Sequence, residues 1–189
     1  MQKGNQHHLR LVSLREALKR NGLDGFLIPL SDEYQSEFPP ACSQRLAWLT
    51  GFDGSAGIAA VLSERAAIFV DGRYTLQARE QVDRGLFEQF HSTEQPLTSW
   101  LSRHAAGKRI GYDPWLHTQA AVARMENTVS ASEVKLVSVR SNPIDSVWYD
   151  RPPPPEQEVF MYHDKMAGRN SAEKRGQIAQ GIKKTLAEA

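Results

Sequence analysis

Residues 51–57, GFDGSAG, combine three glycines with an aspartate and a serine, the residue types of a phosphate-binding loop. The glycine spacing matches neither G-x-G-x-x-G nor the Walker pattern, and no Lys-Ser/Thr pair follows. A phosphate loop also leads into a helix N-terminus. Here residues 58–62 and 66–70 are short apolar runs on either side of Ser-Glu-Arg, a pattern that predicts two paired strands. The segment is therefore predicted to be a tight glycine-rich connection into a hairpin, with no nucleotide role.

The remaining chemically reactive side chains show no catalytic or metal-binding spacing. None of the six histidines has a second histidine four residues away or a carboxylate at ligand spacing. Ser55 lies outside a G-x-S-x-G elbow and has no base near it in sequence, so a serine nucleophile is the weaker alternative there. Cys42 has no recognisable surrounding signature, and a packing role is expected for it. The sequence predicts no metal site in this chain.

Composition limits the classes of binding partner and the cellular compartment that can be expected. The 189 residues include 23 basic and 22 acidic side chains, a net charge of +1, so no overall field attracts nucleic acid or an anionic membrane. A single cysteine excludes an internal disulfide and fits a reducing compartment. No signal-peptide core and no apolar stretch of membrane-spanning length is present. We expect a cytoplasmic protein without nucleic-acid or membrane partners. The four tryptophans are dispersed, which favours core or interface positions over a stacking platform.

The pattern of secondary structure that must position these residues is α/β. Leucines at 11, 14 and 18 predict an amphipathic helix that stops at Asn21-Gly22, and a buried strand is expected at 25–29. Short helices are expected at 44–49 and 74–82. Beyond them, strands (86–91, 109–112, 134–139) alternate with helices (96–104, 117–127). This alternation predicts a mixed, largely parallel sheet flanked by helices.

The C-terminal part is expected to leave this domain. Four consecutive prolines at 152–155 favour a stiff extended connector. We therefore expect a first domain over residues 1–149, a proline-rich linker over 150–158, and the start of a second, truncated domain over 159–189. The helical stretch 171–189 has a narrow apolar stripe (Ile178, Ile182 and Leu186) that needs a covering partner.

Two segments together carry a more specific signal. Residues 43–62, SQRLAWLTGFDGSAGIAAVL, followed by 66–78, AAIFVDGRYTLQA, resemble the N-terminal domain of the Xaa-Pro aminopeptidases of the creatinase and prolidase family. The likeness continues upstream in IPLSDEYQSEF (28–38) and downstream in RIGYDP (109–114) and NPIDSVWYDRPPPP (142–155). It is similar to the long, three-domain form, in which a creatinase/prolidase-type first domain precedes the linker.

The resemblance implies a metalloaminopeptidase that removes an N-terminal residue preceding proline, with a metal-bound hydroxide held by two divalent ions such as manganese. In the family the metal ligands belong to the third domain, and no stretch here matches them. The chain is therefore expected to be inactive and cofactor-free by itself, with a role in homodimer formation and in the substrate cleft. The alternative is a free-standing binding or regulatory module of the same fold.

The resemblance also implies three substrate-facing residues. Arg73 of DGRY follows a predicted strand, where ligands of α/β sheets gather, and the matching arginine of the family lies at the cleft. Its guanidinium offers a fork of donors suited to peptide oxygens. Asp53 and Ser55 are expected to contribute at the cleft edge. The alternative for Arg73 is a brace in which it pairs with Asp71, Asp53 or another acid.

Overall fold

The core of the protein is a six-stranded sheet with the order β4-β3-β2-β1-β5-β6. The computed structural model describes residues 3–185. The strands are β1 (Gly25–Pro29), β2 (Gly57–Leu62), β3 (Ala66–Val70), β4 (Glu88–His91), β5 (Arg109–Tyr112) and β6 (Lys135–Ser138). Strand β2 is antiparallel to both of its neighbours, and the other three pairings are parallel. The predicted mixed, largely parallel sheet is confirmed, with β2 alone reversed.

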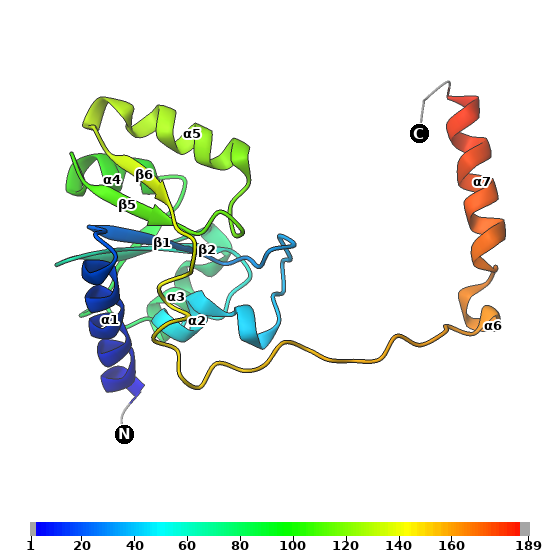
Figure 1. The fold of residues 1–189 in the computed structure, drawn as a ribbon, viewed down its shortest axis with the longest axis horizontal. Helices are drawn as coiled ribbons and strands as arrows, with labels where there is room; N and C mark the ends of the chain where they lie inside the picture. Colours follow the sequence, from blue (N-terminus) through cyan, green and yellow to red (C-terminus); the bar gives the residue numbers. More distant parts are fainter. Residues whose placement is uncertain (1–2, 186–189) are drawn as a thin grey trace. The chain divides into compact units, whose positions relative to one another are not determined.

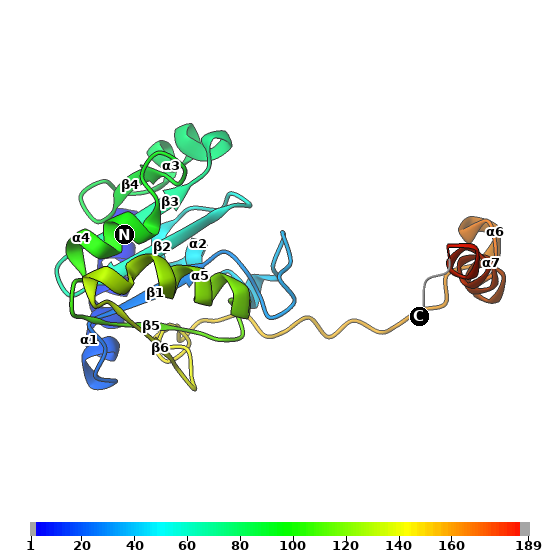
Figure 2. The ribbon, with the colours of Figure 1, turned by 90° about the horizontal axis from the view of Figure 1, so that it is seen from above.

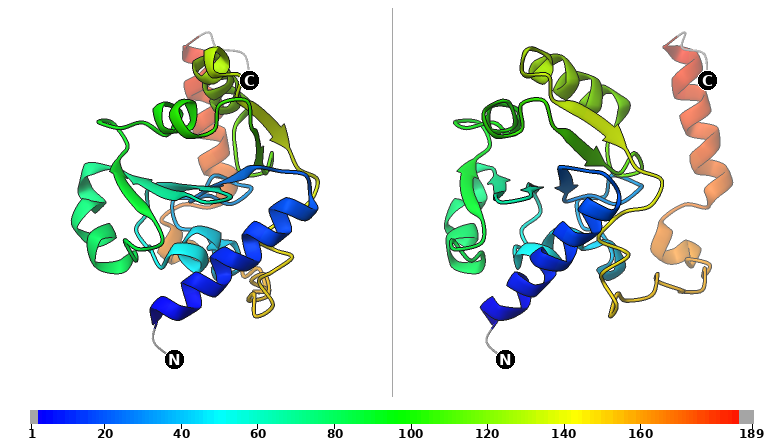
Figure 3. Two further views of the ribbon diagram at one scale, coloured as in Figure 1. Left: turned by 90° about the vertical axis from the view of Figure 1, so that its left-hand side faces the viewer. Right: turned by 60° about the vertical axis from the view of Figure 1, so that its left-hand side comes forward.

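Helices cover both faces of this sheet (Figure 1). Helices α1 (Lys3–Arg20), α2 (Arg45–Thr50) and α3 (Thr75–Gln81) pack on one face, and α1 crosses that face obliquely (Figure 3). Helices α4 (Leu97–His104) and α5 (Gln119–Val129) pack on the other face and lie over the strands when seen from above (Figure 2). Alternate residues of one strand serve the two cores: Phe26 belongs to the first and Leu27 to the second. The result is a three-layer α/β domain.

Local sequence signals explain where the elements begin and end. Gly22 and Gly51 have positive φ angles of 65° and 83°, which suit the glycine stops after α1 and α2. Strand β4 starts two residues later than predicted, because the carbonyl of Asp83 accepts the amides of Leu86 and Phe87 in a turn. Helix α5 starts at Gln119 instead of 117, because the Thr118 side chain caps it by accepting from Ala121 N. The predicted elements are thus confirmed with shifts of about two residues.

Strand direction places the loops that carry the candidate residues together. Since β1, β3, β4, β5 and β6 run the same way, the loops after their last residues all lie at one edge of the sheet. Residues 51–56 enter the reversed strand β2 at that same edge. This carboxyl edge is the usual ligand-binding edge of an open α/β sheet.

The tryptophans divide between core and surface. Trp48 and Trp148 are buried and stack with ring centroids 5.4 Å apart, and Trp100 is buried in the second core. Trp115 is 74% exposed. Three of the four thus lie in the core, one of the two predicted kinds of position, and Trp115 is a surface aromatic on the loop after β5. An interface position for Trp115 stays a prediction.

The contacts divide the chain into Met1–Pro154 and Pro155–Ala189. In the second unit, Asn170 caps α7 (Ser171–Lys184) by accepting from Glu173 N, and α6 (Asp164–Ala167) is a single turn. No residue of either helix is buried, and Ile178 is 63% exposed. The predicted helix 171–189 is observed as far as Lys184, and Leu186 lies outside the described residues. That residues 159–189 begin a second domain remains a prediction. Within residues 3–185, no helix has the length and apolar character needed to cross a bilayer.

Candidate functional site

The segment 51–57 is shaped by aromatic packing. Phe52 is fully buried, and its ring meets the ring of Tyr74 edge-on at 5.7 Å between centroids. A Cβ atom added to Gly54 would lie 2.4 Å from Phe52 Cζ and 2.7 Å from Tyr74 Cδ1. The residue at 54 must therefore lack a side chain, and the segment leads into strand β2, as predicted.

Ser55 connects three loops of the carboxyl edge. Its Oγ lies 2.7 Å from the hydroxyl of Tyr74 and donates a hydrogen bond of 3.2 Å to Glu37 Oε1. These residues belong to the loops that precede β2, follow β3 and follow β1, respectively. The hydrogen-bond partners of the Ser55 hydroxyl are a phenol and a carboxylate, and none is a histidine among the described residues. The geometry thus gives Ser55 a bridging position in the loop cluster.

Asp53 is tied to helix α3. Its Oδ1 accepts hydrogen bonds of 2.6 Å from Gln77 Nε2 and 2.7 Å from Gln81 Nε2, and its backbone N–H donates to Gln81 Oε1 at 3.2 Å. Two glutamines four residues apart on one helix face can reach the same carboxylate. These hydrogen bonds attach Asp53 to helix α3. Asp53 and Ser55 share no hydrogen-bond partner.

Arg73 is exposed and braced at once. Asp71 accepts from Arg73 N at 2.9 Å, from its Nη2 at 2.7 Å and from its Nε at 3.2 Å, and the guanidinium lies 5.3 Å from the Tyr74 ring centroid. These hydrogen bonds lower the pKa of the Asp71 carboxyl and raise the pKa of Arg73. The Arg73 side chain is nevertheless 69% exposed. The brace predicted as the alternative is present, and it leaves part of the guanidinium accessible.

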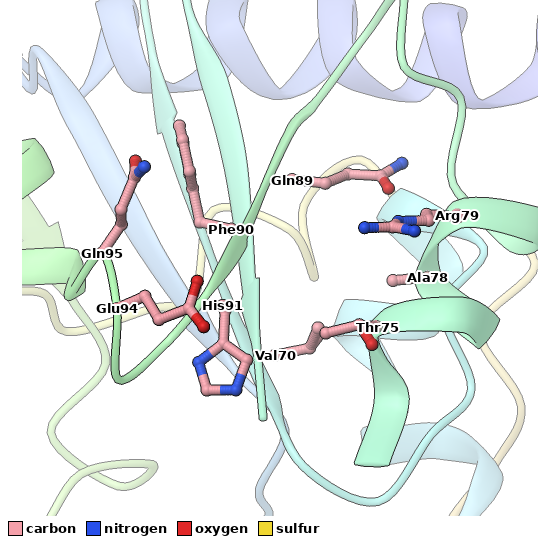
Figure 4. A pocket seen from close by; sticks show the side chains of 9 residues that line it. All are labelled: Val70, Thr75, Ala78, Arg79, Gln89, Phe90, His91, Glu94 and Gln95. Atoms are coloured by element: carbon pink, nitrogen blue, oxygen red, sulfur yellow. The ribbon is translucent and has the colours of Figure 1, made fainter. Parts of the chain in front are cut away.

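A cavity of about 390 Å³ lies beside this cluster, at the ends of β3 and β4 (Figure 4). Its wall on one side comes from helix α3 and on the other from β4 and the turn after it. The Nδ1 of His91 accepts from Thr93 N at 3.2 Å, so the ring has a fixed orientation. The lining residues are Val70, Thr75, Ala78, Arg79, Gln89, Phe90, His91, Glu94 and Gln95.

The cluster includes residues that the sequence did not single out. Glu37 and Tyr74 lie in the motifs QSEF and DGRY, and this membership is the sequence signal that could have identified them. Only the fold shows that both side chains are hydrogen-bonded to Ser55. Gln77 also lies inside the segment 66–78, whereas Gln81 carried no signal, because glutamines on a helix face are usually ordinary surface residues. For metals, no group of three or more His, Cys, Asp or Glu side chains suited to an ion occurs within residues 3–185. A two-metal centre therefore does not fit the residues described.

Comparison with known proteins places the chain in a family. The family described as the Creatinase/Prolidase N-terminal domain matches residues 10–147. A probable Xaa-Pro aminopeptidase P of Talaromyces marneffei is 35% identical over 178 residues, which is 92% of this chain and 27% of that protein. One from Coccidioides posadasii is 38% identical over 169 residues, which is 87% of this chain and 28% of that protein. The chain thus spans little more than a quarter of the length of these curated relatives.

Solved structures agree with the fold. The X-prolyl aminopeptidase of Caenorhabditis elegans, described as a cytosolic enzyme with a di-nuclear active site, superposes with a TM-score of 0.79 at 27% identity, covering 95% of this chain and 32% of the worm chain. The N-terminal domain of the cytoplasmic peptidase PepQ of Mycobacterium tuberculosis gives a TM-score of 0.59 at 25% identity, covering 74% of this chain and 98% of that domain. On the sequence match, the sheet and its loops, this chain belongs to the creatinase/prolidase N-terminal domain family.

Proposed function

We propose that this chain is the non-catalytic N-terminal domain of a cytoplasmic, metal-dependent Xaa-Pro aminopeptidase, which removes an N-terminal residue preceding proline. The curated relatives that match most of this chain are named probable Xaa-Pro aminopeptidase P, and a similar solved structure is described as a cytosolic enzyme. In this proposal the natural polypeptide continues into a domain that supplies a pair of divalent ions, manganese being our expectation. The ions would activate the attacking water. The complete protein is proposed to be a homodimer.

The observation that carries the proposal is the presentation of Arg73 at the carboxyl edge. Asp71 holds the Nε and Nη2 side of the guanidinium, and the Tyr74 ring lies beside it. The remaining N–H groups of this exposed side chain can donate to a carbonyl or carboxylate oxygen of a short peptide. A guanidinium fixed in advance loses less entropy on binding than a free one. Arg73 is therefore the proposed substrate-binding residue of this domain.

Asp53 and Ser55 are proposed to support the same cleft. Ser55 links the Tyr74 hydroxyl to Glu37, so it holds the ring beside Arg73 in place. Asp53 attaches the segment 51–57 to helix α3 through its hydrogen bonds with Gln77 and Gln81. Their proposed role is to position the loops that face the peptide.

The test uses the complete natural protein and an Xaa-Pro tripeptide. Arg73→Ala should lower kcat/KM by about tenfold or more, the cost of a hydrogen bond to a charged group. Arg73→Lys keeps the charge without the fork and should restore only part of the activity. Arg124→Ala, an exposed arginine on α5, is the matched control. Unchanged kinetics together with a large loss of stability in Arg73→Ala would show that the brace is the only role.

The proposed absence of catalysis in this chain has its own assay. The purified 189-residue chain with added manganese should not cleave Xaa-Pro peptides above a metal-only blank. Turnover that is abolished by substitutions in this chain would overturn the proposal. A natural stop codon after Ala189 would favour the free-standing module instead.

A further inference from the structure

A second cleft, of about 670 Å³, lies at the carboxyl ends of the parallel strands β1, β5 and β6. It is bounded by the loops that follow these three strands. Its lining residues are Glu33, Tyr34, Arg45, Asp113, Trp115, Leu116, Arg140, Ser141, Asn142, Asp145 and Arg151. None of them belongs to the Arg73 cluster or to the cavity of Figure 4. We call it the β1-β5-β6 cleft.

Hydrogen bonds between the loops fix the walls of the cleft. Ser31 Oγ donates to the carbonyl of Leu116 at 2.9 Å, which joins the first loop to the second. Asn142 Nδ2 donates to Asp113 Oδ2 at 2.9 Å, which joins the second to the third. Both bonds are buried. The cleft is therefore formed in advance of any ligand.

One arginine donor in this cleft lacks an acceptor. Two guanidinium groups share the carboxylate of Asp145: Arg45 binds it at 2.7 and 2.9 Å, and Arg151 binds it at 2.7 Å. The Arg45 side chain is only 8% exposed, yet its Nη1 has no hydrogen-bond partner among the described residues. Burial alone would lower the pKa of Arg45, but the carboxylates of Asp145, Asp113 and Glu33 together raise it, so the group stays charged. A buried N–H without a partner indicates a site for an additional acceptor.

The lining residues include three arginines and three carboxylates, so the site is marked by an unpaired donor and not by net charge. Both oxygens of Asp113 are occupied, Oδ1 by Trp115 N and Oδ2 by Asn142. Arg140 is exposed and forms no salt bridge with any residue in the range 3–185. Glu33 is exposed, and no side-chain hydrogen bond or salt bridge of its carboxylate is found among residues 3–185. An oxyanion would supply the acceptor that the arginines lack.

Two exposed aromatic side chains add an apolar surface. Trp115 is 74% exposed and Tyr34 is 82% exposed. Their backbones are fixed, since Tyr34 N donates to Asp32 Oδ1 at 3.0 Å and Trp115 N donates to Asp113 Oδ1 at 3.0 Å. Large aromatic side chains on a fixed backbone are typical anchors of binding sites. The ligand should therefore carry an apolar group close to its oxyanion.

We propose that the β1-β5-β6 cleft binds a carboxylate of a peptide chain, with Arg140 as the accessible cation and Trp115 and Tyr34 as the apolar walls. The carboxylate comes from the C-terminus of the peptide or from an acidic side chain. This site is separate from the proposed aminopeptidase function and does not rest on it.

The position of Trp115 provides the assay. The other three tryptophans are 4–8% exposed, so a ligand in the cleft changes the fluorescence of Trp115 in particular. The 189-residue chain is titrated with three probes: acetyl-Ala-Ala-Leu with a free carboxylate, the same peptide as its amide, and acetyl-Ala-Glu-Leu-amide. The acetyl group removes the free N-terminus that an aminopeptidase substrate requires. Failure of this test is therefore distinct from failure of the proposed function.

We expect saturable binding of at least one carboxylate probe, and the probe that binds identifies the source of the carboxylate. Arg140→Ala should weaken it about tenfold or more. Arg124→Ala removes the same charge from an exposed side chain and should leave binding unchanged, as should Arg73→Ala. Trp115→Phe should abolish the fluorescence change, with binding then followed by amide chemical shifts. Equal binding of the amide, an unaffected Arg140→Ala variant, loss in Arg73→Ala, or no saturation with any probe would overturn the proposal.

Discussion

The Gly54→Ala substitution tests whether aromatic packing determines the sequence of residues 51–57. Ordinary van der Waals contact begins at 3.4 Å, and the new Cβ would lie 2.4 Å from Phe52 Cζ, so that ring must move by about 1.0 Å. Tyr74 Cδ1, at 2.7 Å, must move as well. Phe52 is fully buried, so its ring cannot turn out into solvent. Overpacking of this kind costs about 1–3 kcal/mol.

Denaturant unfolding followed by tryptophan fluorescence measures this cost. All four tryptophans lie within Met1–Pro154, so the signal reports on the domain that contains Gly54. For a domain of this size, each kcal/mol corresponds to about 2–4 °C in Tm. Gly176→Ala is the matched control, because a Cβ there meets nothing within 4 Å and the residue lies in α7. Its fluorescence transition should not move.

A double-mutant cycle identifies the clashing ring. Phe52→Leu removes the Cζ atom, so the cost of Gly54→Ala should be smaller in that background. The measured quantity is the coupling free energy between the two sites. A Gly54→Ala variant that loses less than about 0.5 kcal/mol, the range of ordinary surface changes, would refute the packing argument.

Three further predictions concern other parts of the chain. Asp145→Asn leaves the buried Arg45 without its carboxylate; because Asp145 is 28% exposed, we expect a loss of about 2–3 kcal/mol, below the value for fully buried pairs, and an unchanged denaturation midpoint would contradict this. Burial lowers the pKa of His117, so the unfolded chain binds a proton more readily; the stability that this neutral histidine provides is present above pH about 6.5 and is lost as the pH falls below it. His117→Gln should flatten the dependence of unfolding free energy on pH between about 7.5 and 5.5, and equal slopes for the variant and the unaltered chain would count against the burial argument. Amides of α7, which buries no residue, should exchange with deuterium much faster than those of β3, and equal protection in a demonstrated monomer would be the contrary result.

The local elements of this protein could be read from its sequence. The leucines at 11, 14 and 18 are three and four residues apart, which places them on one face of a helix. The glycines at 22 and 51 take the left-handed conformation that ends a helix. Strands buried on both faces have continuous apolar sequences, so the composition of the runs at β2 and β3 is enough to predict them. Both strands are largely buried in the structure. These properties depend on residues within a few positions of each other.

The candidate residues could be named from sequence, but their partners could not. Arg73 and Ser55 stand in recognisable motifs, whereas the hydrogen bond between Ser55 Oγ and the Tyr74 hydroxyl joins the loop before β2 to the loop after β3. Likewise, Arg45 and Asp145 are 100 residues apart in sequence. No periodicity or motif links such positions, because their contact depends on which strands become neighbours.

The sequence by itself therefore determined the elements, their class and the candidate side chains, since each follows from local conformational preference and burial. The tertiary structure decided that β2 alone is reversed, which delivers the segment 51–57 to the same edge as Arg73. It also decided that Trp115 is exposed and lines the same cleft as Arg140, while the other tryptophans are buried. Strand order and direction are properties of the whole chain, because the free energy of a sheet pairing depends on every segment that competes for the same edge.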